Sequence, residues 1–195
     1  MWQRALNFVK GDGDYRRKIL LWATAVSLLC GLIDFGEPVE DQLRIIRNAL
    51  HRHPASGQIA VVLVDDASLK KYGSWPWSRR YHAQLVDRLN AFGARRILFD
   101  IAFSGPTNRE DDKLFADAIA RSRAPVTLAT MFGYNLITHE RADVGADPLF
   151  ARHARLGNIN TWANAFGLVW KLPYSGRVSG SVYPSYASIL SGRRG

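Results

Sequence analysis

The fold is decided by the stretch Arg79–Thr130, which reads RRYHAQLVDRLNAFGARRILFDIAFSGPTNREDDKLFADAIARSRAPVTLAT. It opens with apolar residues at three- and four-residue steps, so we expect an amphipathic helix over 79–92. Ser78 is a good N-cap for that helix, and Gly93 is a good left-handed end. The apolar run Arg95–Phe103 follows at once and predicts a strand.

The alternation of helix and strand continues on both sides of this first pair. Downstream, Thr107 and Glu110 have the spacing of a capping box, which predicts a second helix, and Val126–Thr130 predicts the strand after it. Upstream, the β-branched run Ile59–Asp66 predicts a strand buried on both faces. This order is typical of α/β folds with right-handed crossovers, so we expect a parallel-rich central sheet with flanking helices.

The pattern is weaker after Met131, where turn-forming residues are frequent. Phe166–Pro173 and residues 177–182 are expected to pair as a C-terminal β-hairpin across Tyr174–Gly176. Tyr183–Gly192 predicts a closing helix that starts near a proline and ends at a glycine.

An uncharged apolar segment, Ile19–Ile33, lies near the N-terminus. It follows three basic residues and precedes acidic ones, which predicts a transmembrane anchor over 19–35, with residues 1–18 in the cytoplasm and a domain of residues 37–195 outside. A cleaved signal peptide and a buried helix of a soluble core have similar compositions. The small residues that a signal peptidase needs do not follow the segment, so we favour the anchor.

A helix next to the membrane is predicted over Pro38–Arg52. Its apolar residues fall on one stripe, formed by Val39, Leu43, Ile46 and Leu50. The stripe must cover either the domain that follows or the same helix of a second subunit, and we expect a homodimer.

The chain is strongly basic, with a formal net charge of +9. Such a charge raises nucleic acid as a partner, but the lysines and arginines are scattered along the sequence and no nucleic-acid-binding motif accompanies them. We therefore expect no nucleic-acid binding. The single cysteine, Cys30, excludes an internal disulfide.

Five aspartates are candidates for a metal site: Asp65, Asp66, Asp100, Asp111 and Asp112. The last two lie in the first turn of a predicted helix, where negative charge is favoured anyway. Asp65 and Asp66 end the first predicted strand and Asp100 lies in the second, and the carboxyl ends of parallel strands meet at one edge of a sheet. Mg²⁺ held there would make the chain an α/β phosphohydrolase. However, Asp66 is also placed to cap the short helix that follows, and no phosphate-binding loop is present. We expect no catalytic residue, metal or cofactor, and the hydrolase is the alternative.

Aromatic residues concentrate in the loop after the first predicted strand. Trp75 and Trp77 flank a proline there, and Arg79 and His82 follow on the next helix. Loops at this edge of an α/β sheet commonly line the ligand site, although packing is the commoner role of an indole. We expect packing as the main role of both tryptophans, and ligand contact as the second.

Short motifs follow one another in a fixed order between Val61 and Ala129: DDASL after an apolar strand, GSWPWSR, the GAR that ends a helix, FDIAFS, and EDD at the start of the next helix. Together they resemble the CHASE2 domain, an extracytoplasmic sensor module of bacterial transmembrane receptors. YPSYASILSG, at Tyr183–Gly192, is similar to the closing helix of that family. The resemblance covers the chain from about Glu37 onward.

The resemblance implies a sensor that is not itself an enzyme. It implies an inner-membrane protein with a periplasmic sensor domain, an unidentified small-molecule or peptide stimulus, and a cytoplasmic output outside this chain. That output would be a cyclic-di-GMP synthase or phosphodiesterase, an adenylate cyclase or a kinase. The candidate ligand-binding residues are Asp65, Asp66, Trp75, Trp77, Arg79, His82 and Asp100.

Overall fold

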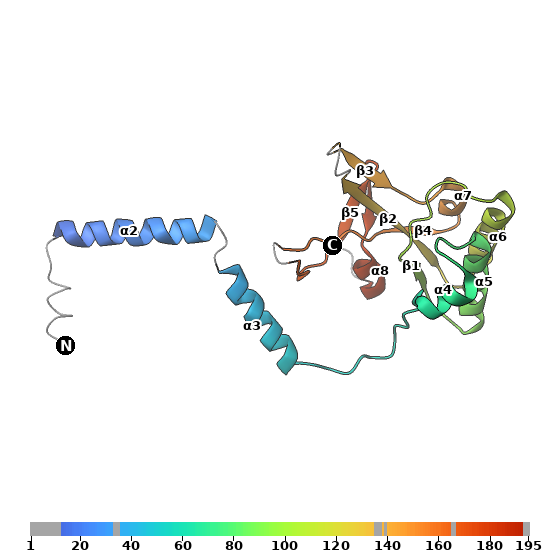
Figure 1. Cartoon of the computed structure of the whole chain (residues 1–195), viewed down its shortest axis with the longest axis horizontal. Coiled ribbons are helices and arrows are strands. Elements are labelled where there is room, and N and C mark those ends of the chain that lie inside the picture. The colour runs from blue at the N-terminus through green and yellow to red at the C-terminus, as the bar shows by residue number, and fades with distance from the viewer. Residues whose placement is uncertain (1–12, 33–35, 135–137, 139, 165–166, 193–195) are drawn as a thin grey trace. The chain divides into compact units, whose positions relative to one another are not determined.

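The computed structural model describes residues 13–32, 36–134, 138, 140–164 and 167–192 (Figure 1). It divides into two compact units, Met1–Leu63 and Val64–Gly195. Each unit is described by itself below.

The first unit holds two helices, α2 (Gly13–Leu32) and α3 (Glu37–Leu50). α3 confirms the helix predicted over Pro38–Arg52, although it ends two residues earlier than expected. Pro38 lies in its first turn, and the Arg44 guanidinium pairs with Glu40 one turn earlier. The apolar stripe of α3 is exposed, at 64%, 61%, 53% and 78% for Val39, Leu43, Ile46 and Leu50.

No single helix in the described part of the chain is both long and apolar enough to cross a membrane. α2 and α3 meet that requirement only as a pair, and the pair is bent by 62°. The end of the expected anchor, residues 33–35, lies outside the described residues.

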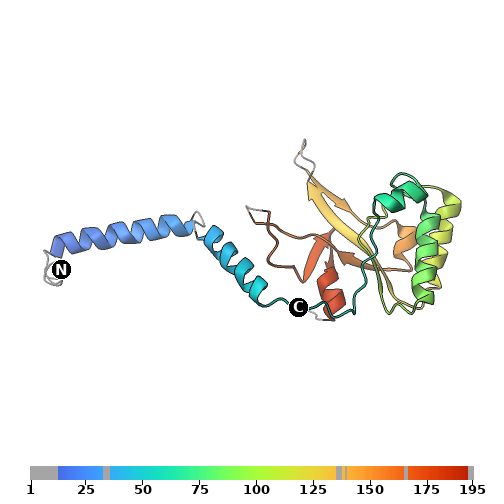
Figure 2. The same ribbon diagram turned by 60° about the horizontal axis from the view of Figure 1, so that its bottom comes forward.

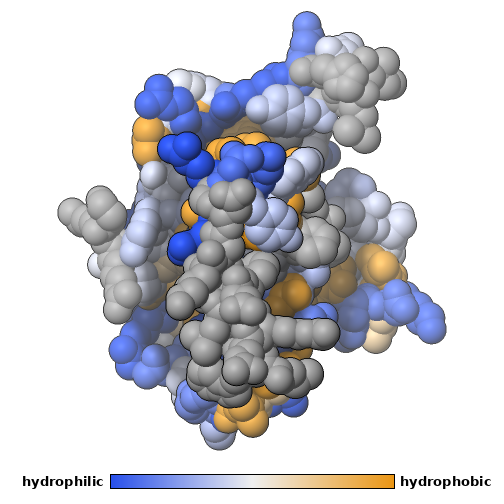
Figure 3. All heavy atoms as spheres, turned by 90° about the vertical axis from the view of Figure 1, so that its left-hand side faces the viewer, coloured by the Kyte–Doolittle hydropathy of each residue, from blue (hydrophilic) through white to orange (hydrophobic). Residues whose placement is uncertain are grey.

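The strand expected over Ile59–Asp66 is wrong. Residues 59–65 form neither helix nor strand, and α4 (Asp66–Tyr72) begins where the strand should end. The apolar side chains of the run are exposed, up to 75% at Val61, and Figure 3 shows hydrophobic residues at the surface among hydrophilic ones. β-Branched residues favour extended backbone, but a strand also needs a hydrogen-bonding neighbour, and no described strand pairs with this run.

Three parallel strands form the centre of the second unit, with β2 between β1 and β4. In this sheet Ile97 is in register with Val126. β3 runs antiparallel to the last four residues of β2. The parallel sheet of the expected α/β fold is therefore confirmed, with two additional strands. The strand bounds are β1 (Ile97–Phe99), β2 (Val126–Tyr134), β3 (Arg141–Val144) and β4 (Arg155–Asn158).

Two predicted helices, α5 (Arg79–Ala91) and α6 (Arg109–Ala120), lie side by side on one face of the sheet (Figures 1 and 2). Ser78 caps α5 as expected, because its Oγ accepts from the Arg80 N–H at 3.2 Å. α6 is capped by Asn108, not by Thr107, since the Asn108 amide oxygen accepts from two backbone N–H groups. The single-turn helix α7 (Pro148–Ala151) completes a core that includes Phe99, Phe103, Phe115, Leu128 and Phe150.

A hairpin and the last helix, α8 (Tyr186–Ser191), lie on the opposite face of the sheet (Figures 1 and 2). The hairpin pairs β5 (Ser175–Val178) with β6 (Ser181–Pro184). Its turn lies at Ser179–Gly180, and not at 174–176 as expected. Both turn residues have positive φ, 49° and 79°, as a type I′ hairpin turn requires. Phe166, where the expected hairpin began, lies outside the described residues.

The closing helix is confirmed, but Ser185 is its N-cap. The hydroxyl of Tyr186 donates to the Phe99 carbonyl oxygen at 2.5 Å, which ties α8 to β1. The Tyr186 ring packs over Gly157 of β4, where an added Cβ would lie 2.6 Å from the ring. α8 can therefore pack against the sheet because position 157 has no side chain.

Substitution of Gly157 tests this packing of α8 against β4. We expect Gly157→Ala to destabilise the protein by about 1–3 kcal/mol, because the methyl group overpacks the contact with Tyr186. Gly133→Ala in β2 is the matched control, since no atom lies within 4 Å of a Cβ there. Urea denaturation of both variants measures the difference. Equal changes in the two free energies of unfolding would contradict the packing account.

Candidate functional site

The candidate site lies where the N-terminal ends of α5 and α6 meet, at the carboxyl edge of β1 and β2. α/β folds place ligand sites at this edge of the sheet. The site has a buried layer of charged and aromatic side chains and an exposed layer of aromatic side chains. The geometry of each layer follows from how the two helices are capped.

The buried layer is centred on the ion pair of Arg79 and Asp112, which are 7% and 2% exposed. The Arg79 Nε lies 3.8 Å from the Asp112 Oδ1, and the guanidinium lies 4.6 Å from the centre of the Phe103 ring. Asp112 also accepts from the Thr107 N–H and hydroxyl, both at 2.8 Å. Burial lowers the pKa of Arg79, while the charges of Asp112 and Asp147 oppose that shift. The aspartates therefore favour the charged guanidinium in an apolar setting.

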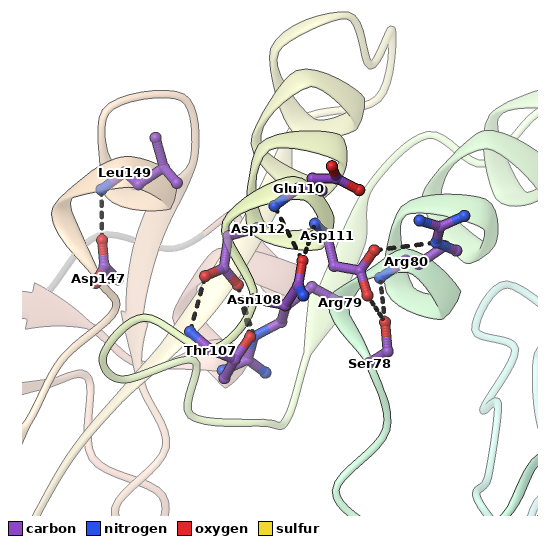
Figure 4. A network of polar contacts seen from close by, with 10 residues as sticks. All are labelled: Ser78, Arg79, Arg80, Thr107, Asn108, Glu110, Asp111, Asp112, Asp147 and Leu149. Carbon is purple, nitrogen blue, oxygen red and sulfur yellow. Dashed lines mark hydrogen bonds and ion pairs between the residues drawn. The ribbon is translucent and has the colours of Figure 1, made fainter.

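A second link joins the same two helices at the surface. Ser78 donates its hydroxyl proton to Asp111, and the Arg80 Nε donates to the other Asp111 oxygen at 3.0 Å. Hydrogen bonding from Ser78 and the charge of Arg80 lower the Asp111 pKa. Figure 4 shows Asp111 and Asp112 leaving the first turn of α6 in different directions, one towards Ser78 and the other towards Thr107. Adjacent carboxylates thus hold the loops before both helices.

His82 lies one turn after Arg79 and is 3% exposed. Its ring packs against three aromatic rings. The distances between ring centres are 5.1 Å to Phe103, 5.8 Å to Trp75 and 5.9 Å to Phe115. The Nε2 atom is buried without a hydrogen-bond partner among the described residues. Burial, aided by the positive charge of Arg79, lowers the pKa of His82 to about 4. His82 is therefore held neutral inside an aromatic cage.

The exposed layer is an aromatic cluster at the start of α5, which we call the aromatic surface and define as Tyr72, Trp75, Trp77 and Tyr81. Trp75, Tyr72 and Tyr81 are 44%, 39% and 37% exposed. The Trp77 indole N–H donates to the Gly73 carbonyl oxygen at 2.9 Å, and its ring meets Tyr72 edge to face. The peptide bond between Trp75 and Pro76 is cis. Trp77 thus has a packing role, whereas Trp75 presents a free face to solvent.

The five candidate aspartates do not gather as a metal centre. Asp111 and Asp112 pair with side chains of the site, whereas Asp65, Asp66 and Asp100 lie apart from it. Asp65 caps α4 by accepting from the Ser68 N–H and hydroxyl, which lower its pKa, and Asp66 lies in the first turn of that helix. Asp100 follows β1, and its charge adds to the burial that raises the pKa of Tyr186. Among the described residues, no three His, Cys, Asp or Glu side chains are grouped to hold a metal ion. The convergence that the phosphohydrolase required is not observed.

The structure brings four of the seven candidate ligand-binding residues together: Trp75, Trp77, Arg79 and His82. Sequence patterns missed Asp111 and Asp112 as partners, since two acidic residues in a first helical turn are explained by the helix dipole alone. They also missed Phe103 and Phe150, which cover the Arg79 guanidinium from other elements. The pairing of a buried arginine with an acid on another helix has no local signal in the sequence.

Fold and site together define an α/β domain with an aromatic surface over a buried ion pair, at the usual ligand-binding edge. The family model described as "CHASE2 domain" matches residues 12–187. The chain therefore belongs to the CHASE2 family, whose members are extracytoplasmic sensory domains. The resemblance seen in the motifs is confirmed, and the match extends it to the N-terminal helices. No curated protein and no solved structure matches the chain.

The low pKa of His82 predicts a loss of stability in acid. As the pH falls from 6.5 towards 4, the unfolded chain binds a proton that the folded His82 does not, so the free energy of unfolding decreases by up to about 3 kcal/mol. His82→Leu should remove this part of the pH dependence, and the exposed His153→Leu should keep it. Thermal unfolding between pH 4 and pH 7 measures the effect. Parallel stability curves for wild type and His82→Leu would exclude a cage that keeps the imidazole neutral.

Proposed function

We propose that this chain is the sensory part of a membrane-anchored bacterial receptor that detects a stimulus outside the cytoplasm. Membership of the CHASE2 family supports the sensory role and the extracytoplasmic context. The domain boundaries follow the sequence analysis: residues 1–18 in the cytoplasm, an anchor over 19–35, and the sensor over 37–195. The output is an enzyme outside this chain, of the cyclic-di-GMP, adenylate cyclase or kinase type, and the sensor itself needs no cofactor.

The observation that carries the mode of sensing is the position of Trp75. Its indole is 44% exposed on the aromatic surface, and its ring also contacts the buried His82 at 5.8 Å. A small molecule or peptide that stacks on this surface therefore contacts Trp75, which is itself in contact with the buried His82. Aromatic faces bind apolar, aromatic and cationic groups well, so the stimulus carries such a group.

The topology can be tested by cysteine labelling of the full chain in a bacterial host. In a Cys30→Ser background, we expect a membrane-impermeant maleimide to label Lys70→Cys in cells whose outer membrane is permeabilised. Arg17→Cys should be labelled only after lysis, because basic residues that precede an anchor stay in the cytoplasm. Both positions are exposed in the structure. Labelling of Arg17→Cys but not of Lys70→Cys in the permeabilised cells before lysis would reverse the proposed orientation and contradict the proposal.

We also propose that two copies of the chain pair through α3. The exposed residues Val39, Leu43, Ile46 and Leu50 alternate steps of four and three, as the a and d positions of a coiled coil do. A second α3 is the partner that matches such a stripe residue for residue. Pairing here would also bring the helices of two receptors together next to the membrane.

Charge substitution on α3 tests the pairing. We expect Leu43→Glu/Ile46→Glu to weaken the dimer by at least about tenfold, because each leucine or isoleucine buried in such a seam contributes about 1.5–3 kcal/mol. Ile45→Glu is the control, since Ile45 is 44% exposed but lies off the stripe. Cross-linking of the full chain in mild detergent gives the dimer fraction over a range of concentrations. A wild-type chain that stays monomeric throughout would rule out this interface.

A further inference from the structure

Six arginines of the second unit lie at one edge of its parallel sheet, the edge opposite the candidate site. The carboxyl edge holds acidic residues in the loops and first helical turns that follow β1 and β3, and two of them pair with Arg79 and Arg80: Asp100, Glu110, Asp111, Asp112 and Asp147. Arginines lie at the opposite edge, in the three connections that lead into β1, β2 and β4 and at the first residue of β4: Arg95, Arg96, Arg121, Arg123, Arg152 and Arg155. We call these six residues the arginine edge.

The fold creates this edge from arginines that are scattered in the sequence. The amino ends of parallel strands meet at one edge of a sheet, so the three connections become neighbours. Figures 1 and 2 show the loops that leave α5 and α6 on the same side of the unit as the end of α8. Arg96 confirms that closeness, because its Nη1 donates to the Ile189 carbonyl oxygen of α8 at 2.6 Å.

Most of the positive charge at this edge is not neutralised. In the described part of the chain, Asp87 is the one carboxylate that pairs with any of these arginines, at 2.6 Å from Arg121. Arg95, Arg123 and Arg155 are exposed and have no carboxylate partner there. Helix dipoles favour positive charge only within the last turn of a helix, so they do not account for these three side chains.

An exposed aromatic side chain lies within the arginine edge. Phe92 follows the last turn of α5 and is 84% exposed, the highest value for a large hydrophobic side chain among the described residues. It is flanked by Arg88 and Arg95 in the sequence. Phenylalanine among arginines is the composition of segments that rest in the headgroup region of an anionic bilayer.

We propose that the arginine edge docks on the surface of an anionic membrane, with the arginines on lipid phosphates and Phe92 in the headgroup layer. This inference rests on the proposed extracytoplasmic, membrane-anchored function, which keeps the domain close to a bilayer. Each arginine that reaches an anionic surface strengthens binding about fivefold, so even three of them give a strong preference over a neutral surface. The binding chemistry is phosphate recognition by guanidinium, and the source of the phosphate is the lipid.

The test uses the full chain in nanodiscs of phosphatidylcholine with and without phosphatidylglycerol. A fluorophore is attached at Phe92→Cys in the Cys30→Ser background, and quenching by lipids with nitroxide headgroups is measured. We expect at least about threefold stronger quenching with the anionic lipid and a return to the neutral-lipid level in high salt. A fluorophore at Tyr134→Cys, at the far end of β2, should be quenched weakly in both lipids. Equal quenching at position 92 in both lipids would overturn the proposal.

Charge reversal identifies the residues. Arg95→Glu/Arg123→Glu/Arg155→Glu should abolish the effect of phosphatidylglycerol, whereas Lys70→Glu/Lys71→Glu/Arg109→Glu, with the same change in charge, should leave it. The control residues lie on α4 and at the start of α6. Glutamine at the same three arginines serves if the glutamates prevent folding. Equal losses in both triple variants would overturn the assignment to this edge, as would binding of duplex DNA with no lipid dependence at position 92. The labelling of positions 70 and 17 is independent of these outcomes, so the proposed function can stand if docking fails.

Discussion

The second unit depends on keeping one positive charge out of water. Arg79 lies beneath Phe103 and Phe150, and a buried guanidinium needs an opposite charge nearby to offset the cost of its desolvation. Asp112 supplies the charge, and Thr107 fixes Asp112 from the loop before α6. The first turns of α5 and α6 are therefore coupled. If either one moved away, a buried charge would lose its partner, at a cost of about 3–5 kcal/mol in stability.

A sensor needs a structural element that has two states. The stimulus site proposed above lies over the coupled first turns of α5 and α6. A ligand that moves such an element from mostly off to mostly on must favour one state by about 5.5 kcal/mol. Stacking on one exposed indole supplies a fraction of that energy. A stimulus at the aromatic surface therefore has to act on the buried layer as well, and the contact between Trp75 and His82 gives it a direct route.

The elements of the fold that have local signals could be predicted from the sequence. Ser78 and Gly93 marked both ends of α5, and the run after Pro125 marked β2. The run Ile59–Asp66 predicts a strand because β-branched residues favour extended backbone, whereas a strand also depends on a partner elsewhere in the chain. The site divides in the same way. Residues within the loop and first turns around Trp75 and Arg79 were found, but Asp112 was not, because its pairing crosses between helices.

The net charge of the chain does not indicate where the positive side chains lie, and only the fold shows which of them lie close together. In sequence the scattered arginines did not indicate a partner, while in the structure six of them lie at the edge opposite the aromatic surface. α5 and α6 span the distance between the two edges: their first turns hold the buried ion pair, and their last turns lead into the arginine edge. If lipid fixes one end of this helix pair, a ligand at the other end must displace the rest of the domain. The position of the stimulus and the position of the membrane would then set the direction in which the signal travels.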